Sequence, residues 1–334
     1  MNRITDYRLA NIVAINGQRA VTDMRNGRRS TGVFVRIQVS FQIAVAVVTA
    51  IRNRGSLLAL VENIGINENG EDRILYNGRI AGFVGRVNEV VDPASAVRLT
   101  STAVGTTQLD ETVFIPFGPA WQISPTETAY VEKDSRVSLQ TFVTWTPTVA
   151  NMVDIGGATV TIGVPTITVW QAGDDERHKR PLFVPYYREQ SLVISGTGLQ
   201  PPVYVKTVRW VRAMALMQDT NVGEQSDIIT NIVLRGDTRD FISPPGGTLT
   251  DLARLRESRQ LSRATADPGY LYLNFCDGGR LSNALSPVND ANVRFEFTAQ
   301  PSAAVGATSS SIRIAVLEIE RVPGLTADRL SFAA

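Results

Sequence analysis

An internal repeat restricts the fold of this chain more than any other sequence feature. Residues 63–89 and 231–257 align without a gap, 168 positions apart, and seven of the aligned residues are identical. Each copy reads as a strand, a polar turn, a second strand and a short helix. A repeated supersecondary unit of this kind predicts two domains built on the same plan.

The helix of each copy is predicted from apolar residues at helical spacing. In the first copy Ile80, Val84 and Val87 form the apolar stripe. Gly82 and Gly85 weaken this prediction, because each costs about 1 kcal/mol relative to alanine in a helix. In the second copy the stripe follows a capping threonine and consists of Leu249, Leu252 and Leu255.

Alternating strands follow the repeated unit in the same order in both halves. The corresponding pairs are 113–117 with 271–275, 137–141 with 293–297, and 160–164 with 312–316. The offset shrinks from one pair to the next, which predicts shorter loops in the second half.

The predicted fold is all-β, with two tandem jelly rolls or sandwiches and short helices in their loops. Alternation from Val33 to Val48 predicts one long strand with a buried face, and a single strand is predicted over 203–217. The regular helices that a parallel α/β fold needs are missing from the pattern. We predict a first domain over residues 1–172, a linker over 173–187 and a second domain over 188–334.

Composition narrows the function classes. The chain has 334 residues and is 43% hydrophobic, which is enough for two cores. Its formal net charge of +1 argues against binding a polyanion with the whole surface. The single cysteine, Cys276, excludes an internal disulfide. The start lacks a secretory signal and residues 39–51 are too short to span a bilayer, so we expect synthesis in the cytoplasm and no integral membrane segment.

Residues 1–36 form a basic region, with seven arginines and two aspartates. One interpretation is a solvated edge with a hairpin at Asn26-Gly27. The other is an inward-facing arm that touches lipid head groups or nucleic acid. The candidate residues of that arm are Arg3, Arg8, Arg25, Arg28 and Arg29.

Residues with catalytic chemistry are scarce. The single histidine, His178, lies in the charged linker between Arg177 and Lys179, and Cys276 ends an apolar strand, which favours a packed, inert thiol. Asp174 to Glu176 lack the spacing of an EF-hand calcium loop and read as a solvated charge run, while a calcium site on oxygen ligands stays open. We therefore predict no catalytic, cofactor-binding or metal-binding residue and no enzyme, although carboxylates paired only in space stay open.

With the duplicated unit in view, the chain resembles the double jelly-roll major capsid proteins of icosahedral viruses, including bacterial viruses with an internal membrane. The resemblance rests on the tandem all-β architecture, on the repeated unit at 63–89 and 231–257, and on the second-half segment 270–285 with the strands at 293–297 and 312–317. It covers most of the chain.

The resemblance implies a structural role. Two upright eight-stranded barrels would stand side by side, and three chains would form a homotrimer with a pseudo-hexameric outline. Such trimers would tile a virion shell assembled in the host cytoplasm, over an internal membrane. The implied partners are other copies of the chain and minor capsid or vertex (penton) proteins. Lipid or the genome stays open as the target of the basic region.

Two rival functions remain open. A receptor- or glycan-binding β-sandwich protein of a virion or tail predicts an exposed pocket lined by aromatic rings or carboxylates. A carbohydrate-active jelly-roll enzyme predicts two carboxylates about 5–10 Å apart in a groove. The duplication favours the capsid role, because a single binding or catalytic site needs only one barrel.

Overall fold

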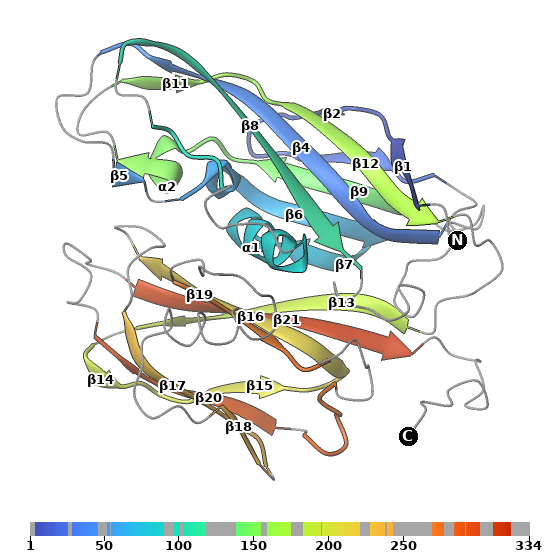
Figure 1. The fold of residues 1–334 in the computed structure, drawn as a ribbon, viewed down its shortest axis with the longest axis vertical. Coiled ribbons are helices and arrows are strands. Elements are labelled where there is room, and N and C mark those ends of the chain that lie inside the picture. Colours follow the sequence, from blue (N-terminus) through green and yellow to red (C-terminus); the bar gives the residue numbers. More distant parts are fainter. Residues whose placement is uncertain are drawn as a thin grey trace.

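The computed structural model describes sixteen stretches of the chain. They are residues 4–25, 29–45, 52–53, 55–89, 96–100, 103–117, 138–154, 159–174, 183–194, 196–220, 228–237, 239–242, 269–276, 284–290, 292–300 and 310–321. The elements below belong to these stretches, and the arrangement is shown in Figure 1.

The first barrel consists of two antiparallel sheets that face each other. The β4 sheet contains β1 (Ile4–Arg8), β2 (Ile12–Val13), β4 (Arg29–Ile43), β8 (Gly105–Pro116), β11 (Val160–Ile162) and β12 (Thr166–Asp174). The β6 sheet contains β3 (Arg19–Asp23), β6 (Val61–Glu68), β7 (Glu71–Tyr76) and β9 (Leu139–Trp145). The remaining elements are the strand pair β5 (Arg52–Asn53) and β10 (Val153–Asp154), and the helices η1 (Leu57–Leu60), α1 (Gly78–Glu89) and α2 (Val149–Met152).

The second barrel repeats this construction. The β16 sheet contains β13 (Phe183–Val193), β16 (Trp210–Thr220), β19 (Tyr270–Asn274) and β21 (Ser310–Arg321). The β17 sheet contains β14 (Gly198–Leu199), β15 (Val203–Lys206), β17 (Ile229–Arg235), β18 (Asp240–Ile242) and β20 (Asn292–Ala299).

Both barrels have the strand order of a jelly roll. In the first barrel β1 with β2 counts as the first strand and β11 with β12 as the eighth. Counted in this way, the strands of the β4 sheet are ordered 1-8-3-6 and those of the β6 sheet 2-7-4-5. The β16 and β17 sheets have the same two orders. The predicted fold class, two tandem eight-stranded jelly rolls, is therefore confirmed.

Three β-bulges lie at equivalent positions in the two barrels. One separates Ile66 from Asn67 in the first barrel and Leu234 from Arg235 in the second, where β6 pairs with β7 and β17 with β18. The second bulge follows Val61 in β6 and Ile229 in β17. All four positions keep the offset of 168 found in the sequence. The third bulge leaves Thr31 of β4 and Arg212 of β16 unpaired in the ladders with β12 and β21.

These registers correct two of the predicted correspondences. Ile314 of β21 is equivalent to Val169 of β12, because both strands are aligned by the third bulge. The sequence paired Ile314 with Ile162 instead, seven residues too early. The reason is that the eighth strand of the first barrel is interrupted at Gly163 to Pro165, and the sequence alignment stopped at its first piece, β11.

The predicted correspondence for β9 is wrong by a smaller amount. Val143 and Phe297 both lie opposite equivalent isoleucines, so they are the matching pair. The sequence paired Phe297 with Thr141, two residues too early. The correspondence of 113–117 with 271–275 is right, because Val35 pairs with Val113 and its equivalent Leu216 pairs with Leu271.

The predicted strand at 203–217 is two strands in different sheets. β15 belongs to the β17 sheet and β16 to the β16 sheet, so the chain crosses between them at Thr207 to Arg209. The Thr207 hydroxyl donates a hydrogen bond to the backbone carbonyl of Asp290, which fixes the crossing. Alternation of apolar residues does not reveal such a crossing, because both sheets contribute apolar faces to one core.

The long strand predicted from Val33 to Val48 is confirmed up to Ile43, where β4 ends. Its alternate residues Val33, Val35, Ile37, Val39, Phe41 and Ile43 are all buried. Val45 is exposed, and residues 46–51 lie outside the described residues. β4 thus supplies the central strand of the first core.

The helix α1 is confirmed, with Ile80, Val84 and Val87 fully buried. Its glycines, Gly82 and Gly85, allow α1 to pack closely against its neighbours and do not weaken the helix. A Cβ at Gly85 would lie 2.7 Å from the Phe114 carbonyl oxygen of β8, and one at Gly82 would lie 2.5 Å from a Leu58 methyl carbon. The second predicted helix, at 248–257, lies outside the described residues.

The predicted linker overlaps two strands. β12 ends at Asp174 and β13 begins at Phe183, so both extend into the range 173–187. Residues 175–182 between them, which include His178, are outside the described residues. The division of the chain at 172 and 188 stays a prediction.

Candidate assembly surfaces

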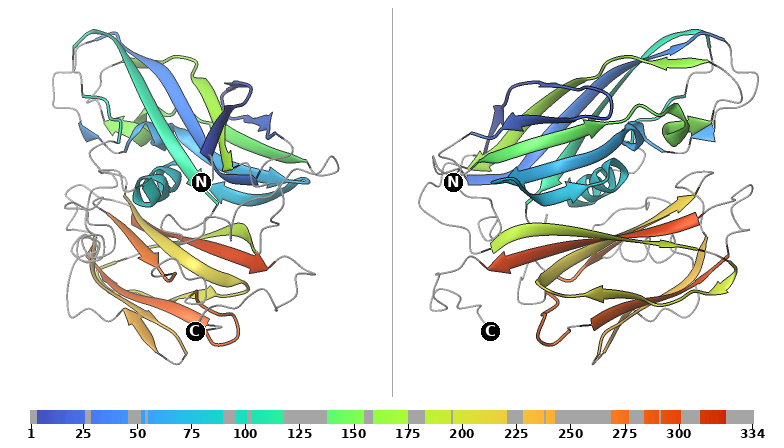
Figure 2. Two further views of the ribbon diagram at one scale, coloured as in Figure 1. Left: turned by 45° about the vertical axis from the view of Figure 1, so that its right-hand side comes forward. Right: turned by 180° about the vertical axis from the view of Figure 1, so that it is seen from behind.

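The contact between the barrels is built around α1, which lies between them in both views of Figure 2. The ring of Phe83 on α1 is 4.7 Å from the ring of Tyr270 and 6.3 Å from that of Tyr272, measured between centroids. Tyr76 of β7 meets Tyr187 of β13 edge-on at 4.5 Å. These aromatic pairs come from both barrels, so the contact is specific as well as apolar.

The outer face of the β16 sheet is apolar where α1 covers it. Ala213, Ala215, Met217, Ala315 and Leu317 are buried in one continuous cluster with the core of the first barrel. The opposite face of the same sheet packs against the β17 sheet in a separate core. A sheet that is buried on both faces joins the two barrels into one body.

Ion pairs lie at the edge of the contact between the barrels. Arg79 of α1 lies 2.8 Å from Asp219 of β16, measured from Nη1 to Oδ1, and its Nη2 donates to the Asn151 carbonyl at 2.7 Å. Asp219 also faces Arg313 at 3.5 Å. Because these groups are partly buried, the pairs are worth more than exposed ones.

A polar groove of about 520 Å³ runs between the barrels beside these pairs. Its carboxylates already have partners within the described residues. Glu62 accepts from the Thr146 hydroxyl at 2.9 Å, Asp72 forms an ion pair with Arg19 at 2.6 Å, and Glu189 accepts from the Tyr187 hydroxyl at 2.6 Å.

Two groups of the groove have shifted pKa values. The hydrogen bond from Arg19 lowers the pKa of Asp72, and a bond from Asn67 acts in the same direction. Burial raises the pKa of Tyr187 well above its ordinary value, and the neighbouring Glu189 carboxylate adds to the shift. Both pKa shifts follow from burial and pairing within the fold. Neither shift marks Asp72 or Tyr187 as a proton donor or acceptor for catalysis.

The structure describes the side chains of two of the five predicted basic residues. Arg8 ends β1, and its Nη2 donates to the Asn11 side chain at 3.2 Å. The Arg25 guanidinium lies 5.4 Å from the ring centroid of Tyr7, and the Arg25 amide donates to Gln171 at 2.8 Å. Neither guanidinium has an acidic partner among the described residues. Arg3 and Arg28 lie outside these residues, and Arg29 begins β4 with its side chain undescribed.

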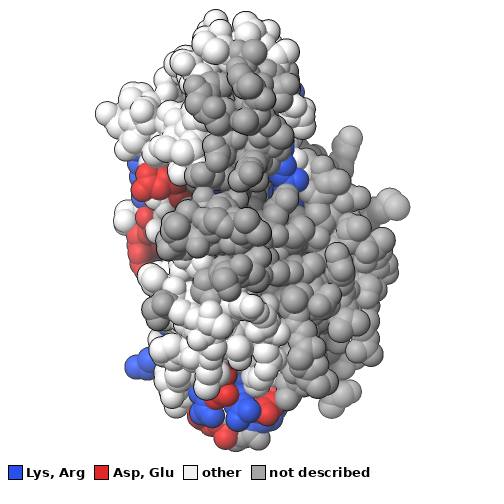
Figure 3. All heavy atoms as spheres, turned by 90° about the vertical axis from the view of Figure 1, so that its left-hand side faces the viewer, with Lys and Arg blue, Asp and Glu red and all other residues white. Residues whose placement is uncertain are grey.

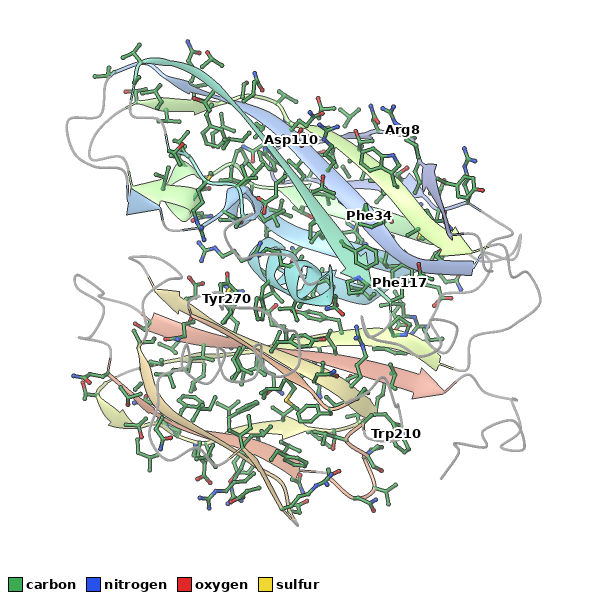
Figure 4. The ribbon with its side chains drawn as sticks, in the orientation of Figure 1. Arg8, Phe34, Asp110, Phe117, Trp210 and Tyr270 are labelled. Carbon is green, nitrogen blue, oxygen red and sulfur yellow. The ribbon has the colours of Figure 1, made fainter. Side chains whose placement is uncertain are left out.

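Arg8 lies toward the same side of the molecule as Trp210. β12 and β21 are the last strands of their barrels, and their arrows point the same way in Figure 1. Arg8 pairs in register with Trp170 in the middle of β12, and Trp210 pairs with Ile319 near the end of β21. Figure 4 labels Arg8 and Trp210 on the same side of the view.

A hollow of about 890 Å³ opens beside Trp210. Its lining includes the rings of Phe241 and Phe275 and the carboxylate of Asp290. No sequence pattern indicates this site, because its lining residues come from distant segments of the chain. Trp210 itself is 38% exposed.

The outer β17 sheet carries charges of both signs. Arg235 lies 3.4 Å from Glu296, and Arg294 lies 2.7 Å from the same carboxylate. Figure 3 shows acidic and basic side chains intermingled at the lower end of the molecule, below a largely uncharged described surface. This end is therefore polar, unlike the apolar contact between the barrels.

The described stretches contain few groups that could form a catalytic or metal site. Cys276 is fully buried. Within the described stretches, no group of three or more histidine, cysteine, aspartate or glutamate residues is placed to hold a metal ion. None of the helices in those stretches has both the length and the apolarity needed to cross a bilayer.

Comparisons with known proteins give matches of structure only. No family model and no curated protein matches the sequence. Among solved structures, the major capsid protein of Sulfolobus turreted icosahedral virus has a TM-score of 0.68 at 11% identity, over 99% of both chains. The capsid of the virus PBCV-1 matches with a TM-score of 0.61 at 10% identity, over 96% of this chain and 94% of that one.

A bacterial virus protein extends the series. The major capsid protein P2 of bacteriophage PM2 has a TM-score of 0.55 at 8% identity, over 97% of this chain and all of that one. Each match spans both barrels, so the likeness concerns their mutual arrangement as well as each jelly roll. The chain therefore has the double jelly-roll fold of viral major capsid proteins.

Proposed function

We propose that this chain is a major capsid protein whose copies tile an icosahedral virion shell. The observation that carries the proposal is the union of two like barrels in one body, through a sheet that is buried on both faces. The solved structures that share this arrangement over nearly their whole length are capsid proteins.

The architecture suits a tile. Three copies of a two-barrel body present six similar barrels around a threefold axis, which is a near-hexagonal outline. Contacts that are weak individually suffice between tiles, because each tile is held by many at once. The proposed partners are therefore other copies of this chain, with minor capsid and vertex proteins where the hexagonal packing closes. The role requires no catalytic residue.

Light scattering on the purified chain followed by negative-stain imaging tests the proposal. We expect particles of three times the 36.4-kDa chain mass, with a hexagonal outline. Shell fragments should appear when the trimers are concentrated. A protein that stays monomeric at every concentration, and also fails to enter shells when the other virion proteins are supplied, would contradict the capsid role.

We further propose that the basic end of the first barrel faces the interior of the shell and meets an anionic surface there, a membrane or the genome. Arg8 and Arg25 are exposed and have no described acidic partner. Each cationic residue near an anionic membrane is worth about 1 kcal/mol.

Replacing Arg25, Arg28 and Arg29 with serine tests the basic end. We expect intact trimers and weaker co-flotation with anionic vesicles. The matched control is Arg294→Ser on the outer β17 sheet, which should leave flotation unchanged. Equal flotation of the triple variant and the unmodified chain would refute an anionic membrane as the target of this end.

A further inference from the structure

The hollow at the end of the second barrel combines three kinds of chemistry. Its wall contains the aromatic rings of Trp210, Phe241 and Phe275, together with Arg239 and Asp290. Phe241 and Phe275 meet edge-on with their centroids 5.9 Å apart, so the aromatic part of the wall is packed in place. An aromatic hollow with a few convergent polar groups has the general character of a ligand site.

Asp290 is the fixed element of this wall. Its side chain is 4% exposed, and its backbone amide donates to the Ser286 carbonyl at 2.8 Å. The contacts of its carboxylate within the described stretches are a long one from the Ser286 amide, at 3.4 Å, and Arg239 at 3.7 Å. A carboxylate has about four acceptor positions, so this one retains capacity for a donor that enters the hollow.

Arg239 reveals which charge the wall accepts. Its guanidinium lies 4.7 Å from the centroid of the Phe241 ring while it faces Asp290. The side chain is 60% exposed and can therefore yield its place over the ring without unfolding anything. Aromatic faces and a carboxylate together stabilise a cation, including an alkylammonium group.

Two exposed valines flank the hollow. Val288 is 85% exposed and Val208 is 59% exposed, and they lie in the two turns next to Trp210 and Asp290. A partly exposed tryptophan with apolar side chains beside it is a combination that also occurs where proteins meet a membrane interface. A soluble sugar would leave these valines in water.

We propose that this hollow binds the headgroup of a zwitterionic phospholipid in a bilayer. The ammonium group would lie between Asp290 and the rings, and the phosphate would pair with Arg239. The two exposed valines would contact the interface around the headgroup. The site complements phosphoethanolamine, whose ammonium group carries both the positive charge and the donors that Asp290 can accept. This inference rests on the proposed function, and within it on the membrane as the surface that the interior of the shell meets.

Flotation of the full-length protein with vesicles tests the site. Phosphatidylethanolamine with phosphatidylcholine forms one vesicle set, and phosphatidylglycerol forms the other. We expect binding to the zwitterionic set, reduced about tenfold in D290N, because a charge-assisted hydrogen bond is lost. W210A and V288S should also bind less.

The matched control is V193S. Val193 is 73% exposed on the same barrel and pairs with Ser311, at the opposite end from Trp210. Its substitution should leave flotation unchanged. Soluble phosphoethanolamine at millimolar concentration should compete with the vesicles. Because Trp210 lies at the barrel end and is partly exposed, W210A decides the question if D290N fails to fold.

Three results would overturn the proposal. One is equal flotation of the unmodified protein and W210A. Another is binding to the phosphatidylglycerol set alone, which would leave only the basic end at work. The last is binding of neutral oligosaccharides or peptides in place of vesicles. The oligomeric state of W210A separates the role of the hollow from the capsid role. If W210A loses flotation but still forms trimers, the hollow is affected and the capsid role is not.

Discussion

Single residues decide how closely the helix and the strands of the first barrel approach. Gly85 of α1 faces the backbone of β8, and its sequence equivalent in the second copy is Ala253. A methyl group at Gly85 would lie 2.7 Å from the Phe114 carbonyl oxygen and 3.3 Å from the Phe114 nitrogen. The strand backbone cannot move aside as a flexible side chain can.

We therefore expect Gly85→Ala to destabilise the protein although alanine is the better helix former. The gain in helix propensity is about 1 kcal/mol, and overpacking costs about 1–3 kcal/mol. A net loss of up to about 2 kcal/mol should appear in urea denaturation. Gly196→Ala is the control, because no atom lies within 4 Å of the added methyl group. A stability gain in G85A would show that α1 can shift freely.

Asp72 gives the stability a defined dependence on pH. The Arg19 guanidinium lowers its pKa in the folded state, so its contribution is present above the unfolded pKa of about 3.9. The contribution is lost as the pH falls through the lowered folded value. We expect Asp72→Asn to cost about 0.5–1 kcal/mol at pH 7, since the pair is partly exposed.

Denaturation midpoints at pH 7, 5 and 3 would measure this effect. The difference between D72N and the unmodified chain should be constant from pH 7 to 5 and shrink at pH 3. Asp240→Asn is the matched control, because Asp240 is the equivalent residue of the second barrel and only loosely faces Arg235 at 3.8 Å. A difference for D72N that is independent of pH would exclude the ion pair as its cause.

At the scale of elements, α1 acts as the connector of the two barrels. Phe83 is fully buried and its ring meets two tyrosines of β19. We expect Phe83→Ala to remove about 3–5 kcal/mol, mostly from the contact between barrels. Calorimetry should then resolve two transitions in place of one, since each barrel keeps its own core.

The control for that experiment lies inside the second barrel. Phe297 of β20 is buried in the core between the β16 and β17 sheets, away from α1. Phe297→Ala should destabilise the second barrel through its own core and leave the contact at α1 intact. If F83A melts in a single transition at the original temperature, α1 does not couple the barrels.

Elements near in sequence were predictable, and contacts between distant elements were not. Strands such as β20 follow from alternation, and the repeat at 63–89 revealed the duplication because its bulges fix one register in both barrels. The break at Gly163 to Pro165 hid the second half of the eighth strand. The meeting of Phe83 with Tyr270 left no signal, since nothing local in either segment depends on the other.

For the whole molecule, the sequence indicated two barrels but not how they meet. The hollow at Trp210 also escaped prediction, since its wall is assembled from β16, β18, β19 and the turn before β20. The basic end was recognised as a composition, and two of its members contact β12, Arg8 through strand pairing and Arg25 through Gln171. The fold topology decides where the hollow and the basic end lie, and residue spacing does not encode that topology directly.

The contact between the barrels joins unlike surfaces, the helix side of one to a sheet face of the other. Repeated from molecule to molecule, such a contact would grow into a filament unless its rotation closed a ring. The first barrel blocks that growth. Where the second barrel has Met217, the first has Arg36, which donates to Asp110 at 2.8 Å on its open sheet face. An incoming helix would have to bury this ion pair, so stacking terminates at two barrels.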